Sequence, residues 1–104
     1  MKKNAKQDVM MVADEIKTAT GMEWPACIAK AHQLQQLIHR MENGTVSFAY
    51  ERVDGTLRRA TGTLKDVDHL CKGKSRNTYK TLCYYDIKAE AFRSFRVENL
   101  ITIY

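Results

Sequence analysis

The amino-acid sequence predicts an α+β domain in which an N-terminal helical hairpin precedes a five-stranded antiparallel β-barrel of the SH3-like or Sm-like kind. Apolar residues recur at helical spacing before Gly44 and alternate with a period of two after it. Five short strands are expected in residues 45–104. A flat sheet of such strands would leave its edges unpaired and both faces uncovered, so these strands favour a curled barrel.

Two amphipathic helices are expected, over residues 8–19 and 25–42. The first ends before Gly21, which tolerates the positive φ of a helix end, and the second starts at Pro25, which suits a first helical turn. Because the connection is short, an antiparallel hairpin is the simplest arrangement. The apolar positions at helical spacing are Val9, Val12, Ala13 and Ile16 in the first helix, and Trp24, Ile28, Ala31, Leu34, Ile38 and Met41 in the second.

The expected strands alternate apolar and polar residues and are separated by turn residues. Asp54-Gly55 favours a tight hairpin turn, and Gly62 predicts a bend or bulge inside the second strand. Residues 66–77 lack periodicity and predict an exposed basic loop, and residues 97–100 predict a single turn of helix. The five strands are expected at residues 46–51, 56–65, 78–87, 92–97 and 100–104.

Length, charge and cysteine content limit the number of domains, the kind of partner and the compartment that are expected. The 104 residues suffice for a single domain, with residues 1–44 as a helical segment and 45–104 as the barrel. The net charge of +5 favours anionic partners. The three cysteines have no short paired spacing, so they indicate neither a disulfide framework nor a zinc knuckle and favour a cytoplasmic protein. No export signal or membrane span is expected.

The barrel half resembles a known family. An aromatic-rich strand with Tyr84-Tyr85-Asp86 leads through residues 92–101 (FRSFRVENLI) to the last strand, and this order resembles the end of WYL domains. Residues 48–50, 54–56 and 59–64 look like the upstream part of a WYL-like family of small bacterial proteins with an Sm-like SH3 barrel. The resemblance covers residues 45–104.

WYL domains are regulatory modules that bind ligands, among them nucleotides and single-stranded nucleic acid. The resemblance therefore implies a binding module. The chain departs from the family at two places, because Tyr84-Tyr85-Asp86 stands where the Trp-Tyr-Leu signature is expected and Asn99 replaces the basic residue that often precedes the last strand.

Four arginines on strands that are neighbours in a barrel are the main candidates for binding an anionic ligand. Their guanidinium groups suit pairing with phosphate, and two tyrosines beside them suit base stacking. The alternative is that the arginines are solvated or paired with acidic residues of the barrel exterior, namely Glu51, Asp86, Glu90 and Glu98. The candidate residues are Arg58, Arg59, Arg93, Arg96, Tyr84 and Tyr85.

A second basic group lies in the predicted loop, at Lys72, Lys74 and Arg76. Such a cluster attracts an anionic polymer through salt-sensitive contacts that do not depend on sequence. Loops with several lysines also serve as solubilising surfaces, and that alternative stays open.

No catalytic residue, metal site or cofactor is expected. His69 and Cys71 lack further ligands at suitable spacing and an orienting acid. His32 and His39 fall on one side of the second helix as solvated residues, and Cys27 is expected to be a small buried hydrophobe.

Two functions follow from these observations. The first is a non-catalytic WYL-like module that recognises a nucleotide or single-stranded nucleic acid through barrel arginines and tyrosines. The second is a protein-interaction or assembly module whose N-terminal helices dock a partner chain or a second copy. Trp24 either belongs to that docking surface or anchors the helix in the core, where a single tryptophan at a helix start is more often found.

Overall fold

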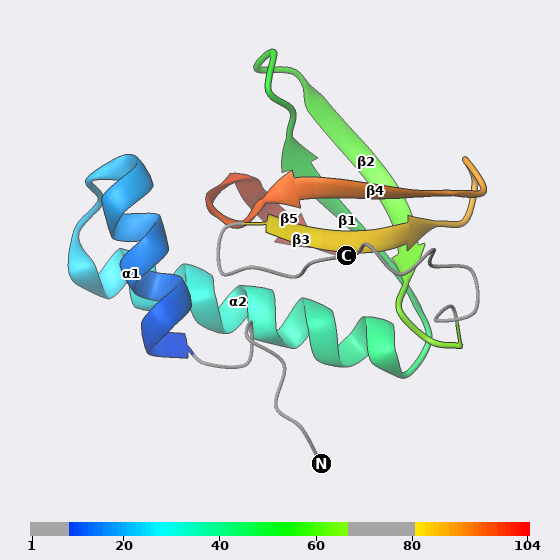
Figure 1. Ribbon diagram of the computed structural model, residues 1–104, viewed down its shortest axis with the longest axis horizontal. Helices are drawn as coiled ribbons and strands as arrows, with labels where there is room; N and C mark the ends of the chain where they lie inside the picture. Colours follow the sequence, from blue (N-terminus) through cyan, green and yellow to red (C-terminus); the bar gives the residue numbers. More distant parts are fainter. Residues whose placement is uncertain (1–8, 67–80) are drawn as a thin grey trace.

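The structure, a computed structural model, describes residues 9–66 and 81–104. Two helices are followed by one five-stranded antiparallel sheet, which confirms the predicted order of elements (Figure 1). No helix in the described residues is long and apolar enough to cross a membrane. The elements are α1 (Val9–Thr20), α2 (Trp24–Glu42), β1 (Thr45–Glu51), β2 (Leu57–Thr63), β3 (Thr81–Asp86), β4 (Ala91–Arg96), the 3-10 turn η3 (Val97–Asn99) and β5 (Leu100–Ile103).

Both helices bury most of the face that their periodicity predicts, while Val9 and Ile28 are only partly buried. Cys27 is fully buried, as expected of a small hydrophobe, while His32 and His39 are exposed. Of the two alternatives for Trp24, a core anchor or part of a docking surface, the core anchor is wrong, because Trp24 is 37% exposed at the first residue of α2. The buried helical residues are Val12, Ala13, Ile16, Cys27, Ala31, Leu34, Leu37, Ile38 and Met41.

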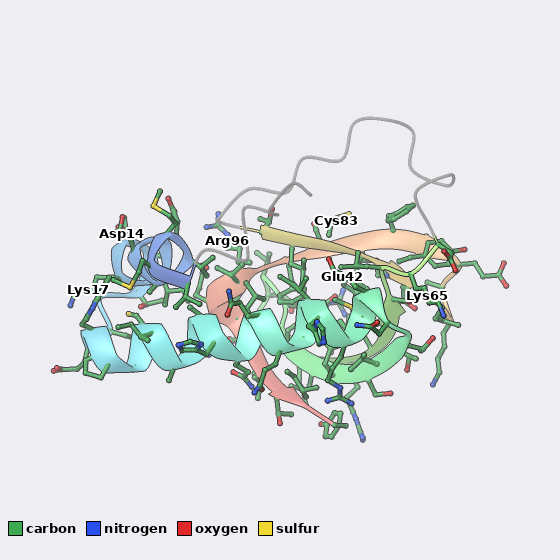
Figure 2. All side chains as sticks on the ribbon, turned by 90° about the horizontal axis from the view of Figure 1, so that it is seen from below. Asp14, Lys17, Glu42, Lys65, Cys83 and Arg96 are labelled. Carbon is green, nitrogen blue, oxygen red and sulfur yellow. The ribbon has the colours of Figure 1, made fainter. Side chains whose placement is uncertain are left out.

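The connection between the helices turns at Gly21, which has the positive φ of +74° that its position predicts. Figure 1 shows α1 steeply inclined to α2, and in Figure 2 α1 is seen almost end-on while α2 runs across the view. The helices thus form a hairpin whose arms diverge. α1 contacts η3, the turn that connects β4 to β5, while α2 packs along β1, β2 and β5.

The strand order β4-β3-β2-β1-β5 places β4 and β5 at the two edges of the sheet. β1 and β2 pair without interruption, and Gly62 lies directly opposite Val46, so of the bend or bulge predicted at Gly62 the bulge is wrong. The shift in register lies between Ala49 and Tyr50, where β1 pairs with β5. Gly62 is needed for a different reason, because a Cβ there would lie 2.5 Å from Cδ2 of the Tyr84 ring.

The outer edge of β5 is covered by polar side chains of α2. Lys30 Nζ donates a hydrogen bond to the backbone oxygen of Leu100 at 2.7 Å, and Gln33 Nε2 donates to that of Ile101 at 3.2 Å. Burial lowers the pKa of Lys30, and the charge of Glu98 partly opposes this shift. These donors satisfy backbone oxygens that an unpaired sheet edge would otherwise present to other chains.

The core joins the helices to an aromatic cluster inside the barrel. The rings of Phe48, Tyr50, Tyr84 and Phe95 contact one another, with centroids between 4.5 and 6.2 Å apart. Phe95 of β4 stacks on Tyr50 of β1 although two strands separate β4 from β1 in the sheet. The sheet must therefore be strongly curled, and this curl brings β4 opposite the β1–β2 hairpin.

Candidate functional site

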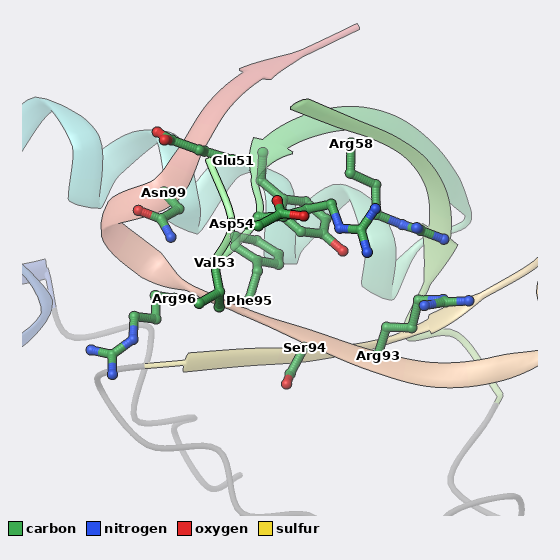
Figure 3. Close-up of a pocket in the computed structure, with 11 residues that line it drawn as sticks. Glu51, Val53, Asp54, Arg58, Arg93, Ser94, Phe95, Arg96 and Asn99 are labelled. Carbon is green, nitrogen blue, oxygen red and sulfur yellow. The ribbon is translucent and has the colours of Figure 1, made fainter. Parts of the chain in front are cut away.

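An arginine-lined cleft lies between the β1–β2 hairpin and β4 (Figure 3). Its volume is about 500 Å³. β2 contributes Arg58, while β4 contributes Arg93 and Arg96. We call this hollow the arginine cleft, and its lining residues are Tyr50, Glu51, Arg52, Val53, Asp54, Arg58, Arg93, Ser94, Phe95, Arg96 and Asn99.

The floor of the arginine cleft is aromatic. Tyr50 and Phe95 stack with ring centroids 4.5 Å apart and an interplanar angle of 14°. Both residues are more than nine-tenths buried, whereas Val53 at the hairpin tip is 96% exposed. The cleft therefore combines an apolar floor with a cationic rim.

A buried carboxylate holds two of the arginines together. Asp86 Oδ2 lies 3.5 Å from Arg58 Nη2 and 3.4 Å from Arg93 Nε, and the Asp86 side chain is only 4% exposed. The other oxygen, Oδ1, accepts a hydrogen bond from the backbone N–H of Ala89 at 3.0 Å. One carboxylate thus faces two guanidinium groups, so the trio carries a net positive charge.

The remaining arginine contacts are looser. Nε of Arg58 is buried without a hydrogen-bond partner among the described residues. Arg96 Nη1 lies 3.8 Å from Glu98 Oε2, with 60% of the arginine side chain exposed, so this pair contributes little to stability.

Asp54, at the rim of the cleft, accepts two hydrogen bonds from Thr56. The hydroxyl group and the backbone N–H of Thr56 donate to the Asp54 carboxylate at 2.7 and 3.0 Å. These hydrogen bonds lower the pKa of Asp54.

Tyr84 does not line the cleft. Its ring is fully buried, and its hydroxyl group lies 2.9 Å from that of Tyr50 in a buried hydrogen bond. The stacking role expected for Tyr84 is therefore not available in this structure, because a base cannot reach the ring. Sequence alternation alone did not show which face of β3 becomes the interior.

Burial raises the pKa of Tyr84, and its hydrogen bond with Tyr50 acts in the same direction. The pKa of Tyr84 in the folded protein lies above its unfolded value of 10.0, so the protonated hydroxyl group contributes to stability below pH 10. This contribution is lost as the pH rises further. We expect the free energy of unfolding to fall above pH 10, and to fall less steeply in Tyr84→Phe. Urea denaturation at a series of alkaline pH values measures this, and identical slopes in both proteins would contradict it.

The other predicted residues are dispersed. Arg59 lies on the opposite face of β2, with its guanidinium carbon 4.7 Å from the centroid of the Tyr104 ring. Tyr85 contacts Phe92 edge-on at 5.2 Å, away from the aromatic core. Lys72, Lys74 and Arg76, together with His69 and Cys71, lie outside the described residues. The structure thus unites Arg58, Arg93 and Arg96 but neither Arg59 nor the two tyrosines.

Sequence reasoning missed three features of the cleft. Neither Tyr50 nor Phe95 was among the candidate residues, and Asp86 was among the exterior partners of the arginines, whereas it is a buried carboxylate. The sequence contained a signal for them, because the two-residue alternation of β1 and β3 places Tyr50, Tyr84 and Asp86 on the buried faces of these strands. In the described residues no group of three or more His, Cys, Asp or Glu side chains could hold a metal ion.

Comparison with known proteins identifies one family. A family model described as WYL_2, an Sm-like SH3 beta-barrel fold, matches residues 34–101. The match starts in the middle of α2 and ends in β5, so it includes every residue of the arginine cleft. Neither the search of curated proteins nor that of solved structures found a match.

Proposed function

The chain belongs to the WYL_2 family of Sm-like SH3 β-barrels, and on this premise we propose that it is a non-catalytic binding module that recognises a nucleotide or single-stranded nucleic acid in the arginine cleft. The single observation that carries the proposal is the convergence of Arg58, Arg93 and Arg96 over an aromatic floor. The volume of about 500 Å³ is within the range of small-molecule sites.

The charge of the cleft favours an anion. Four of its lining residues are arginines, Arg52 being the fourth, against the two carboxylates of Glu51 and Asp54. Arg58 and Arg93 each direct only one nitrogen to Asp86, so N–H groups on their other nitrogen atoms, apart from the buried Nε of Arg58, remain to donate to a ligand. Guanidinium donors of this kind pair well with phosphate oxygens.

The apolar side of the cleft supports a ligand that has more than a phosphate group. Val53 is almost wholly exposed beside the stacked rings of Tyr50 and Phe95. A ribose or base contacting Val53 would bury apolar surface while its phosphate pairs with the arginine rim. This combination favours a nucleotide unit over a simple inorganic anion in the arginine cleft.

The proposal predicts that Arg93→Glu combined with Arg96→Glu strongly weakens this binding. Affinity for a fluorescent oligonucleotide should fall by about a hundredfold, because each lost charge-assisted contact costs roughly tenfold. Fluorescence anisotropy titrations of single-stranded DNA and RNA at several salt concentrations measure the effect. For the wild type, affinity should fall as salt rises, and the slope of log K against log salt should be reduced by about 1.4 in the double variant.

The matched control reverses two exposed charges away from the cleft, in Lys17→Glu combined with Lys65→Glu. This variant has the same net charge as the double arginine variant, so it separates a local contact from a general loss of positive charge. Equal binding by the wild type and the double arginine variant, or no binding near physiological salt, would overturn the proposal.

A second candidate function is protein docking through the helices. Met10, Met11 and Trp24 are 54%, 44% and 37% exposed, and all three belong to α1 or to the start of α2. Exposed large apolar side chains favour contact with another protein. This function becomes the better account if the arginine cleft binds no nucleotide or nucleic acid.

A further inference from the structure

A second hollow lies on the other face of the β1–β2 pair. Arg58 and Arg59 are consecutive on β2, so their side chains point to opposite faces of the sheet. Arg58 enters the arginine cleft, while Arg59 lines a separate hollow of about 290 Å³. The residues of this second hollow are Ser47, Phe48, Arg59, Ala60, Thr61, Lys88 and Tyr104.

Segments far apart in the sequence build the second hollow. The backbone N–H of Ile87 donates to the backbone oxygen of Thr61 at 2.9 Å, which fixes the β3–β4 turn and its Lys88 beside β2. The backbone N–H of Tyr104 donates to the backbone oxygen of Ser47 at 2.9 Å. These two backbone hydrogen bonds therefore fix Lys88 and Tyr104 on two sides of the second hollow.

The guanidinium group of Arg59 is oriented by an aromatic ring. Its central carbon lies 4.7 Å from the centroid of the Tyr104 ring, a cation–π distance. Arg40 Nη2 donates to the backbone oxygen of Tyr104 at 3.1 Å and helps to hold that residue in place. A guanidinium group that lies against a ring keeps its N–H donors at its edge, where an acceptor can reach them.

The cations of this hollow lack the carboxylates that the arginine cleft has. Arg58, Arg93 and Arg96 each pair with Asp86 or Glu98. No aspartate or glutamate lines the second hollow, and over residues 9–66 and 81–104 the side chains of Arg59 and Lys88 form no hydrogen bond or ion pair. Two unpaired positive charges that border one hollow repel each other, and an anion between them removes that repulsion.

We propose that Ser47, Arg59, Thr61 and Lys88 form a second binding site, which takes a phosphate group. The hydroxyl oxygens of Ser47 and Thr61 lie 3.3 Å apart and share one hydrogen bond, so one further hydroxyl proton remains to be donated. A tetrahedral oxyanion offers acceptors to the two cations and to this hydroxyl group at once. The phosphate group is either free inorganic phosphate or part of a nucleic-acid backbone, since both have this chemistry.

The test uses the full chain labelled with ¹⁵N and follows backbone amide signals by NMR at constant ionic strength. One titration adds inorganic phosphate, and a second adds a short oligothymidylate without terminal phosphates. The variants are Arg59→Gln and Lys88→Met, and Lys65→Met is the matched control that removes an exposed charge elsewhere. The dispersion of the amide signals shows whether each variant is folded. Lys88 lies in an exposed turn, so we expect its substitution to leave the fold intact.

We expect inorganic phosphate to shift the amide signals of Ser47, Thr61 and Lys88. The affinity should be about tenfold weaker in Arg59→Gln and in Lys88→Met than in the wild type, and unchanged in Lys65→Met. Shifts by both titrants identify a nucleic-acid backbone as a source, and shifts by inorganic phosphate alone identify the free ion. Absence of shifts at these residues, shifts confined to the arginine cleft, or equal affinity in all variants would overturn the proposal.

Discussion

Replacing Gly62 with alanine is expected to lower the free energy of unfolding by about 3 kcal/mol, at the upper end of the usual cost of overfilling a core. The new Cβ would lie 2.5 Å from Cδ2 and 3.1 Å from Cε2 of Tyr84. These atoms belong to a fully buried ring that contacts Phe48, Tyr50 and Phe95, so the ring has no space into which to move. Urea denaturation followed by circular dichroism measures the loss.

Gly44→Ala is the matched control for this substitution. No atom lies within 4 Å of a Cβ built at Gly44, and its φ is not positive, so the same chemical change meets neither a clash nor strain there. Its free energy of unfolding should stay within about 0.5 kcal/mol of the wild type. If Gly62→Ala were as stable as Gly44→Ala, the close approach of Tyr84 to β2 would be wrong.

Replacing Asp86 with asparagine is expected to change stability and anion binding in opposite directions. The free energy of unfolding should fall by about 2 kcal/mol, less than is typical when a fully buried ion pair is broken. The reduction is smaller because the side chains of Arg58 and Arg93 are 25% and 42% exposed, so water partly compensates them. Asparagine keeps an oxygen for the N–H of Ala89.

Binding should become stronger in the same variant. Removal of the Asp86 charge leaves Arg58 and Arg93 without their shared counter-charge, so the affinity for a single-stranded oligonucleotide at low salt should rise about fivefold. Glu98→Gln, which changes the looser pair with Arg96, is the control and should alter stability by less than about 0.5 kcal/mol. If Asp86→Asn weakened binding and stability together, Asp86 would be a structural support rather than an internal competitor of the ligand.

These two variants test contacts that no single strand reveals. The two-residue alternation of β3 places Leu82, Tyr84 and Asp86 on one face, and the sequence contains that information. It does not say whether this face becomes the interior. Tyr84 was therefore expected to be a binding residue, although it is buried, and Asp86 was expected on the barrel exterior, although it is buried beneath two arginines.

The sequence by itself determined the order of helices and strands, the apolar faces of both helices and the turns at Gly21 and Asp54-Gly55. Each of these depends on residues close together in the chain, where periodicity and backbone preference act directly. Strand alternation alone separates Arg58 from Arg59, the next residue, but only the tertiary structure decided that Arg58 of β2 joins Arg93 of β4 in one cleft. The physical reason is that strand pairing and the curl of the sheet are set by contacts between distant segments, such as Tyr50 with Phe95, which no local pattern specifies.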